Sequence, residues 1–227
     1  MALLTVTMTD AIEGQNARIY IANVAKHDIN TDVEFIIEHL PYRQGDRILD
    51  VGYGTGRLLL RVAELGQNFS LSGIEKSQTL YTWSRNELAA ANVKIANQDF
   101  TECVGYERYD IIIMSFFLHH VGHLASTLDR ARQQLSSSGK IVIYDRILLE
   151  THDKKAFNHY WDTFYADDHE WDEDRPMIFS LAELIQAANA LGFTVVTCRQ
   201  APHDQKPGTS RFPKFFVVLD AGGVFDD

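Results

Sequence analysis

Three glycines alternate with other residues in the segment 48–56, which reads ILDVGYGTG. Gly52, Gly54 and Gly56 would let the backbone turn sharply beneath a bound ligand, because glycine adopts conformations that side chains forbid in other residues. A dinucleotide-binding loop has the spacing GxGxxG, which requires a glycine at the position that Arg57 occupies in this chain. The loop therefore favours a ligand other than NAD or FAD.

Two carboxylates follow the next two predicted strands. Glu75 can accept hydrogen bonds from both hydroxyls of a ribose, and Asp99 can accept one from the exocyclic amine of adenine. The backbone amide of Phe100 can donate to a ring nitrogen of the purine, and its side chain can pack against the ring. An ordinary turn and solvated carboxylates would explain each feature alone, but their joint occurrence at three successive strand ends predicts an adenosine site.

The elements that would position these residues alternate in type. Short apolar runs, the pattern of buried strands, occur at 48–51, 71–74, 93–96, 109–116, 140–144, 194–198 and 212–220. Helical patterns separate most of them, at 57–65, 78–91, 123–135 and 181–191. Parallel strands need such crossover connections, so the order predicts an α/β fold with a largely parallel sheet and helices on both faces.

Two segments have the spacing of a capping box, in which a Ser or Thr begins a helix and a Glu follows three residues later. Thr31 and Glu34 predict one helix in the N-terminal segment, and Pro41 ends its apolar stripe. Ser180 and Glu183 predict the start of the helix at 181–191.

Four segments together resemble the class I family of S-adenosylmethionine-dependent methyltransferases that act on small molecules. They are DVGYGTG at 50–56, GIEKS at 73–77, NQDF at 97–100 and SFFLHHV at 115–121, and the resemblance covers roughly residues 30–200. It implies a Rossmann-like three-layer sandwich with a mostly parallel seven-stranded sheet and an antiparallel last strand. The 227 residues would form one methyltransferase domain. Its parts would be a helical cap at 1–45, a cofactor-binding half at 46–145, a lid insertion at 146–179 and a C-terminal helix with strands at 180–227.

The resemblance also implies which residues hold the cofactor, S-adenosyl-L-methionine, which leaves as S-adenosyl-L-homocysteine. Glu75, with Lys76 beside it, would hold the ribose, and Asp99 with Phe100 the adenine. The expected contacts of the methionine part and the sulfonium are Tyr20, Asp50, Gly52, Tyr53, Gly54, Gly56, Ser115 and Phe116.

Three residues are candidate general bases. His119 and His120 follow the fourth strand, where an imidazole can take a proton from a substrate heteroatom near neutral pH. One histidine could equally brace the loop, since relatives with different substrates share LHH here. Asp145 ends the fifth strand and is the third candidate, with a helix-capping role as the alternative.

The expected acceptor contacts lie in the lid and in the loop before the last strand. Tyr160, Trp161 and Tyr165 have helical spacing, so they would form either a packing stripe or a substrate wall. The acidic run at 167–174 would be a solvated loop or would attract a cationic acceptor. His203 and Arg211 are further candidates, with turn residues as the alternative.

The bulk composition narrows the class of partner. A net charge of −10 disfavours nucleic acid, and the fourth strand lacks the Asn-Pro-Pro-Tyr-like motif of base-modifying relatives. Cys103 and Cys198 are far apart, so neither a disulfide framework nor a thiolate zinc site is expected. The sequence lacks the Asp-Asn dipeptide that would indicate a magnesium site. Neither a leader nor a membrane span is evident. We therefore expect a cytoplasmic monomer or homodimer that methylates an O or N atom of a small acceptor, cationic or aromatic, without a metal. A non-methylating cofactor-binding protein or cyclase is the main alternative.

Overall fold

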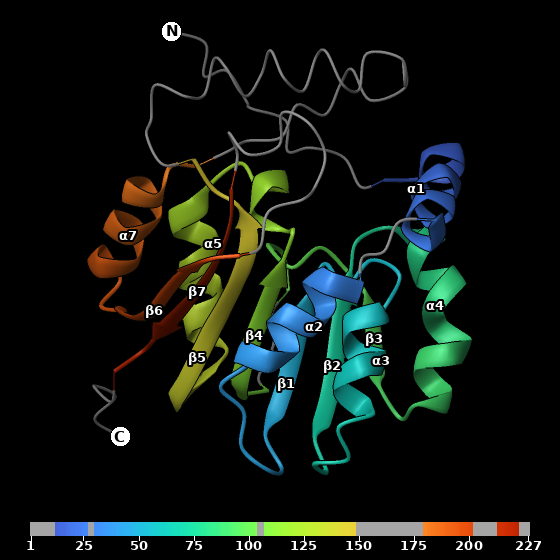
Figure 1. Cartoon of the computed structure of the whole chain (residues 1–227), viewed down its shortest axis with the longest axis horizontal. Helices are drawn as coiled ribbons and strands as arrows, with labels where there is room; N and C mark the ends of the chain where they lie inside the picture. The colour runs from blue at the N-terminus through green and yellow to red at the C-terminus, as the bar shows by residue number, and fades with distance from the viewer. Residues whose placement is uncertain (1–11, 27–29, 104–106, 149–178, 202–212, 223–227) are drawn as a thin grey trace, which may run out of the picture.

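The computed structural model describes residues 12–26, 30–103, 107–148, 179–201 and 213–222. They form a seven-stranded sheet in the order β3-β2-β1-β4-β5-β7-β6 (Figure 1). The strands are β1 (Arg47–Val51), β2 (Ser70–Glu75), β3 (Lys94–Asn97), β4 (Tyr109–Ser115), β5 (Leu135–Arg146), β6 (Thr194–Gln200) and β7 (Lys214–Asp220). Strands β1 to β5 pair in parallel, whereas β7 runs antiparallel to both β5 and β6. The predicted fold class, including the antiparallel last strand, is confirmed.

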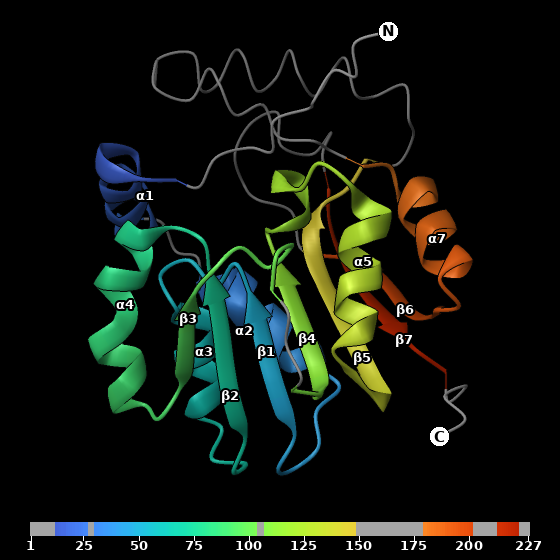
Figure 2. The same cartoon turned by 180° about the vertical axis from the view of Figure 1, so that it is seen from behind.

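Helices cover both faces of the sheet. On one face α2 (Asn30–His39), α3 (Arg57–Ala63) and α4 (Gln78–Ala90) bury Ile36, Leu59 and Leu88 against β1 and its neighbours. On the other face, seen in Figure 2, α5 (Leu124–Gln133) and α7 (Leu181–Ala190) bury Leu128 and Leu184. Helix α1 (Gly14–Lys26) lies beside α4, and the short 3-10 helix η1 (Leu118–His120) follows β4. The sheet is therefore covered by apolar contacts on each side, as parallel strands require.

The two predicted capping boxes have different outcomes. At the start of α7, Oγ of Ser180 accepts a hydrogen bond from the backbone N of Glu183, and Oε2 of Glu183 accepts one from the backbone N of Ser180, so this box is confirmed. The box at Thr31 is wrong, because α2 already begins at Asn30. Glu34 instead accepts a hydrogen bond from Arg61 of α3 at 2.8 Å.

The boundary between α5 and β5 also differs from the prediction. The helix predicted to reach residue 135 ends at Gln133, and β5 begins at Leu135, which pairs with Tyr109 of β4. The extra strand pairing is a contact between segments distant in sequence, and local periodicity does not report it.

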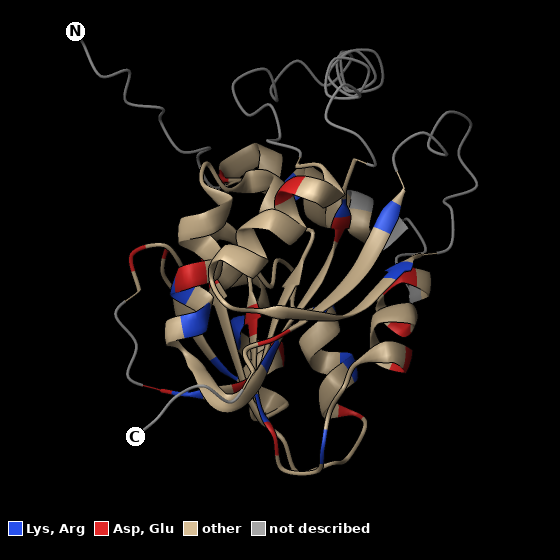
Figure 3. Cartoon of the chain, turned by 90° about the vertical axis from the view of Figure 1, so that its left-hand side faces the viewer, with Lys and Arg blue, Asp and Glu red and all other residues tan. Residues whose placement is uncertain are grey.

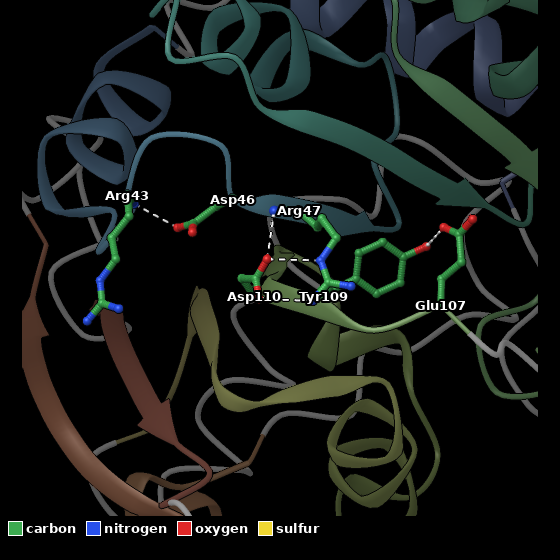
Figure 4. Close-up of polar contacts among 6 residues, drawn as sticks. All are labelled: Arg43, Asp46, Arg47, Glu107, Tyr109 and Asp110. Atoms are coloured by element: carbon green, nitrogen blue, oxygen red, sulfur yellow. Dashed lines mark hydrogen bonds and ion pairs between the residues drawn. The ribbon is translucent and has the colours of Figure 1, made fainter.

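A polar cluster ties β1 to β4 at their amino ends (Figure 4). Asp110 accepts hydrogen bonds from Nε and Nη2 of Arg47, both at 3.1 Å, and from its backbone N at 3.0 Å. Burial acts to raise the pKa of Asp110, but these hydrogen bonds outweigh it and lower the pKa to about 2. The cluster lies at the amino ends of strands whose carboxyl ends carry the predicted site residues, so it offers a control position remote from that site.

Candidate cofactor and acceptor site

A cavity of about 460 Å³ lies at the carboxyl ends of β1, β2, β4 and β5. This is the edge at which doubly wound sheets bind ligands. Almost all of the predicted cofactor residues line it: Tyr20, Asp50, Gly52, Tyr53, Gly54, Glu75, Lys76, Asp99, Phe100, Ser115 and Phe116. Among the candidate bases His119 and His120 line it too, whereas Asp145 does not.

The glycine loop is tied to β2 and covered by α1. The backbone N of Gly54 donates to Oε2 of Glu75 at 2.9 Å, and the backbone N of Gly52 donates to the carbonyl of Ile74 at 2.8 Å. Gly54 has a φ of 57°, and a Cβ there would lie 3.2 Å from the hydroxyl of Tyr20. The loop thus needs glycine both for its left-handed backbone and for the close approach of α1.

Gly56 has a packing role that the sequence analysis did not predict. It does not line the cavity; it precedes α3 with a φ of 80°, and a Cβ there would lie 2.9 Å from Leu88 of α4. Its absent side chain lets α4 pack against the start of α3, and its predicted contact with the cofactor stays a prediction.

Asp50 presents a buried carboxylate oxygen without a partner. The residue is only 2% exposed, and its Oδ1 has no hydrogen bond within the described residues. Burial and the nearby charge of Glu75 raise the pKa of Asp50 to about 8. Buried polar atoms normally have a partner, so this atom fits a ligand that brings a donor or a positive charge. The amino group and sulfonium of S-adenosylmethionine supply both.

Glu75, at the end of β2, hydrogen-bonds the glycine loop and also lines the cavity. Its Oε1 accepts from the backbone N of Ser77 at 2.8 Å, and its Oε2 accepts from Gly54. Burial raises the pKa of Glu75 above its usual value, while the two backbone hydrogen bonds act to lower it. A carboxylate has about four lone-pair sites, so Glu75 retains capacity to accept from a ribose hydroxyl.

Asp99 is held in place by its neighbours. Its Oδ1 accepts from the backbone N of Thr101 at 2.9 Å and from Thr101 Oγ1 at 2.7 Å. Its Oδ2 lies 3.1 Å from Nζ of Lys76. Burial acts to raise the pKa of Asp99, but Thr101 and Lys76 outweigh it and lower the pKa. Lys76, predicted to contact the cofactor, therefore also positions the carboxylate expected at adenine.

Tyr20 reaches the site from α1, as predicted for an aromatic residue of the helical cap. Burial raises the pKa of Tyr20 to about 12, and the charges of Glu75 and Asp50 act in the same direction. Its hydroxyl therefore keeps its proton and can donate a hydrogen bond to a carboxylate such as that of methionine.

The end of β4 carries backbone strain beside the cavity. Phe116 has a φ of 50°, which is uncommon for a residue with a side chain and costs about 1–3 kcal/mol. The backbone N of Phe116 donates to the carbonyl of Tyr144 at 2.7 Å, and the two rings pack edge to face at 5.3 Å. These contacts hold Ser115 and Phe116 at the wall of the cavity.

The three candidate bases form one connected group with different environments. Asp145 is 1% exposed, and its Oδ1 lies 2.7 Å from Nδ1 of His119. Asp145 also accepts hydrogen bonds from the backbone N of His119 at 3.3 Å and of Arg146 at 2.7 Å. The ring of His120 lies 4.0 Å from that of His119. Burial, and then the neighbouring His119, lower the pKa of His120 well below its usual value. Asp145 therefore orients His119 and does not itself reach the cavity.

Several predicted positions lie outside the described residues. They are the lid at 149–178 with Tyr160, Trp161, Tyr165 and the acidic run, and the loop with His203 and Arg211. Their roles stay predictions.

Asp32 is a cavity residue that the sequence analysis missed. It lies four residues before Ile36 and so on the apolar stripe of α2, and it lines the cavity together with Val33 and Ile36. A carboxylate within an apolar stripe is the signal that could have found it. Within the described ranges, no group of three or more His, Cys, Asp or Glu residues is arranged to hold a metal ion. In the same part of the chain, no helix is both long and apolar enough to span a membrane.

Comparison with known proteins identifies the family. The model of a methyltransferase domain family matches residues 25–198, so the chain belongs to that family. The glycine loop, Asp50 and Glu75 of this methyltransferase domain line the cavity in which S-adenosylmethionine is expected to bind.

The relatives with known names are diverse. A reducing polyketide synthase of a Penicillium species is 26% identical over 143 residues, which are 59% of this chain but 6% of the synthase. The carboxy-S-adenosyl-L-methionine synthase of Nautilia profundicola is 24% identical over 175 residues, covering 73% of this chain and 68% of the synthase. A solved complex of the Haloferax volcanii Trm112 methyltransferase activator with a methyltransferase has the same fold. The superposition has a TM-score of 0.70 at 14% sequence identity, and it covers 91% of this chain and 95% of the matched chain of that complex.

Glu75→Gln tests the ribose contact. The amide keeps the shape of the carboxylate but loses its charge and can accept through one oxygen only. A hydrogen bond to a charged group contributes about 1.5–3 kcal/mol, so we expect the Kd of S-adenosylhomocysteine to rise by at least roughly tenfold. Calorimetry measures the Kd, and Asp110→Asn, at the amino end of β4, is the control that should leave it unchanged. A Gln variant that is stably folded and binds as tightly as the wild type would place the ribose elsewhere.

Proposed function

We propose that the chain transfers the methyl group of S-adenosylmethionine to an oxygen or nitrogen atom of a small-molecule acceptor. The observation that carries this proposal is His119, a cavity-lining imidazole held by the buried carboxylate of Asp145. When bound, the cofactor supplies a methyl group activated by its positive sulfonium. In-line displacement then depends mainly on the alignment of the acceptor atom and on the exclusion of water.

His119 is the best-placed general base of the three candidates. Asp145 accepts from Nδ1, which assigns the proton to that nitrogen and leaves Nε2 free to accept a proton from an acceptor hydroxyl or amine. Asp145 also stabilises the imidazolium that results. The lowered pKa of His120 makes its imidazole a weak base, so that ring better serves to pack against His119.

The size and lining of the cavity support a small acceptor. The cavity formed by the described residues has a volume of about 460 Å³, and Val33, Ile36 and Phe116 add an apolar wall beside the cofactor residues. Basic and acidic positions are interspersed along the described ribbon in the view of Figure 3, without a continuous basic stripe. Nucleic-acid binding depends on such a stripe, so these charges favour a small molecule over a base in DNA or RNA.

A second candidate function is a reaction of the cofactor without methyl transfer. The relative from Nautilia profundicola, by its name, makes carboxy-S-adenosyl-L-methionine, and this chain covers 68% of it. The shared residues would then bind the cofactor while the acceptor end of the cavity holds a different small reactant.

Isotope transfer separates these functions. The purified protein is incubated with methyl-deuterated S-adenosylmethionine and a low-molecular-mass metabolite extract, and mass spectrometry follows the label. We expect a small molecule to gain one deuterated methyl group, and the Glu75→Gln control to transfer less at a cofactor concentration below its raised Kd. In parallel incubations with RNA and with a protein extract, label in either would overturn the small-molecule acceptor. A new cofactor derivative without label transfer would favour the second candidate.

A further inference from the structure

Three elements far apart in sequence meet at Asp32. Asp32 lies in the first turn of α2, and its Oδ1 accepts hydrogen bonds from the hydroxyl of Tyr144 in β5 and from Nζ of Lys214 in β7. Tyr144 is fully buried, and Lys214 is 4% exposed. The ammonium of Lys214 also lies 5.9 Å from the centre of the Tyr144 ring. The carboxylate is thus fixed by two buried donors on one of its oxygens.

The other oxygen of Asp32, Oδ2, accepts no hydrogen bond from the described residues. Both hydrogen bonds of Asp32 in the described residues are made by Oδ1, and its side chain stays 18% exposed where it lines the cavity. A carboxylate oxygen accepts up to two hydrogen bonds, so Oδ2 retains the capacity to bind a donor from a ligand.

The strand order places Asp32 at the end of the cavity away from adenosine. Glu75 and Asp99 follow β2 and β3, whereas the partners of Asp32 belong to β5 and β7, with β1 and β4 in between. Next to Asp32 the wall is apolar, formed by Val33, Ile36 and Phe116. An apolar pocket with one precisely held polar group is the usual way to orient a small molecule.

A purely structural latch between α2 and the sheet is the competing explanation. Buried ion pairs add little net stability, because desolvation of the two charges offsets their attraction, and well-packed apolar residues serve as well. A latch also gives no reason for the carboxylate to face the cavity rather than to be fully enclosed. A side chain that lines the cavity and whose Oδ2 accepts no hydrogen bond from the described residues is what distinguishes a binding residue from a latch.

We propose that Asp32 is an acceptor-binding residue. Its Oδ2 accepts a hydrogen bond from a hydroxyl or amino group of the acceptor, while Lys214 and Tyr144 hold the carboxylate through Oδ1. The acceptor class is then a compact, partly apolar molecule with a hydroxyl or amine, oriented against the wall formed by Val33, Ile36 and Phe116. This inference rests on the proposed function, since it assumes a small acceptor in the same cavity.

Asp32→Asn tests the inference sharply. Asparagine can keep its oxygen towards Lys214 and Tyr144, which places its NH2 group, a donor, where the carboxylate presented an acceptor. The protein is loaded with S-adenosylhomocysteine and titrated with benzyl alcohol and benzylamine, which carry a donor, and with benzyl methyl ether, which carries none. We expect the variant to raise the Kd of the two donor probes by about 10- to 150-fold and to leave that of the ether unchanged.

Tyr144→Phe is the matched control, because it removes one donor to Oδ1 but keeps Oδ2 and the ring. It should preserve the preference for donor probes over the ether. The inference is overturned if Asp32→Asn keeps that preference, or if both variants lose thermal stability and binding of all three probes in parallel, as a latch predicts. Failure of the proposed function itself would instead show as absence of isotope transfer by the wild-type protein.

Discussion

His119→Asn is expected to lower kcat for methyl transfer by about 10²- to 10⁴-fold, the usual contribution of a general base. The amide nitrogen of asparagine can occupy the place of Nδ1 and keep the hydrogen bond to Asp145, which measures 2.7 Å in the wild type. The variant therefore preserves the buried contact and removes only Nε2. The affinity for S-adenosylhomocysteine should stay nearly unchanged, because the residues predicted to contact adenosine are Glu75 and Asp99.

Two further variants distinguish a general base at residue 119 from a histidine that only packs against the loop. Asp145→Asn leaves His119 in place but weakens the preference for the proton on Nδ1, so kcat should fall while the KM of the cofactor does not change. His120→Asn should have a smaller effect on kcat, since the pKa of His120 is already well below its usual range. If His119→Asn turns over at the wild-type rate, the histidine only packs against the loop, and the acceptor needs no base.

Local sequence patterns predicted the parts of the fold that depend on neighbours in the chain. The alternation of apolar runs with helical patterns located all seven strands, because buried parallel strands and amphipathic helices have distinct periodicities. The two capping boxes show where such reasoning ends. Ser180 and Glu183 make both reciprocal hydrogen bonds of the capping box at the start of α7, whereas Glu34 pairs with Arg61, which lies 27 residues away. Local spacing does not report a contact of that kind.

The candidate site was predictable where function depends on strand ends and unpredictable where it depends on long-range contacts. The positions of Asp50, Glu75 and Asp99 follow directly from the ends of their strands. The contact of Asp32 with Lys214 spans 182 residues, and no local pattern reports it. The positive φ of Phe116 and its ring contact with Tyr144, a residue of another strand, are likewise not reported by any local pattern.

The second large effect is expected at Asp50, where stability and cofactor binding should change in opposite directions. Its pKa rises from an ordinary value of 3.8 to about 8 in the folded protein. Between these values the folded state keeps a proton that the unfolded chain has released, so stability falls as pH rises through this window. At pH 7 the cost is roughly 4 kcal/mol, at 1.36 kcal/mol for each pKa unit. Asp50→Asn removes this cost.

Thermal unfolding across the pH range tests the stability effect. For a domain of this size each kcal/mol corresponds to about 2–4 °C, so the variant should melt well above the wild type at pH 8. Below pH 4 both forms of Asp50 are protonated, and the two melting temperatures should converge. A variant that melts at or below the wild-type temperature at pH 8 would show that Oδ1 of Asp50 has a partner after all.

The affinity for the cofactor should rise with pH over the same range in which the stability of the folded protein falls. A positive ligand requires the ionised carboxylate of Asp50, so binding below pH 8 must expel the proton, and the affinity of the wild type should rise with pH by up to about tenfold per unit towards pH 8. Asp50→Asn should bind weakly and lose most of this dependence, whereas Asp110→Asn should retain it. Calorimetry in two buffers of different ionisation enthalpy counts the released proton directly. Release of equal numbers of protons by the wild type and by Asp50→Asn would assign the titration to another group. Oδ1 of Asp50 would then lower the stability of the folded protein without contributing to cofactor binding.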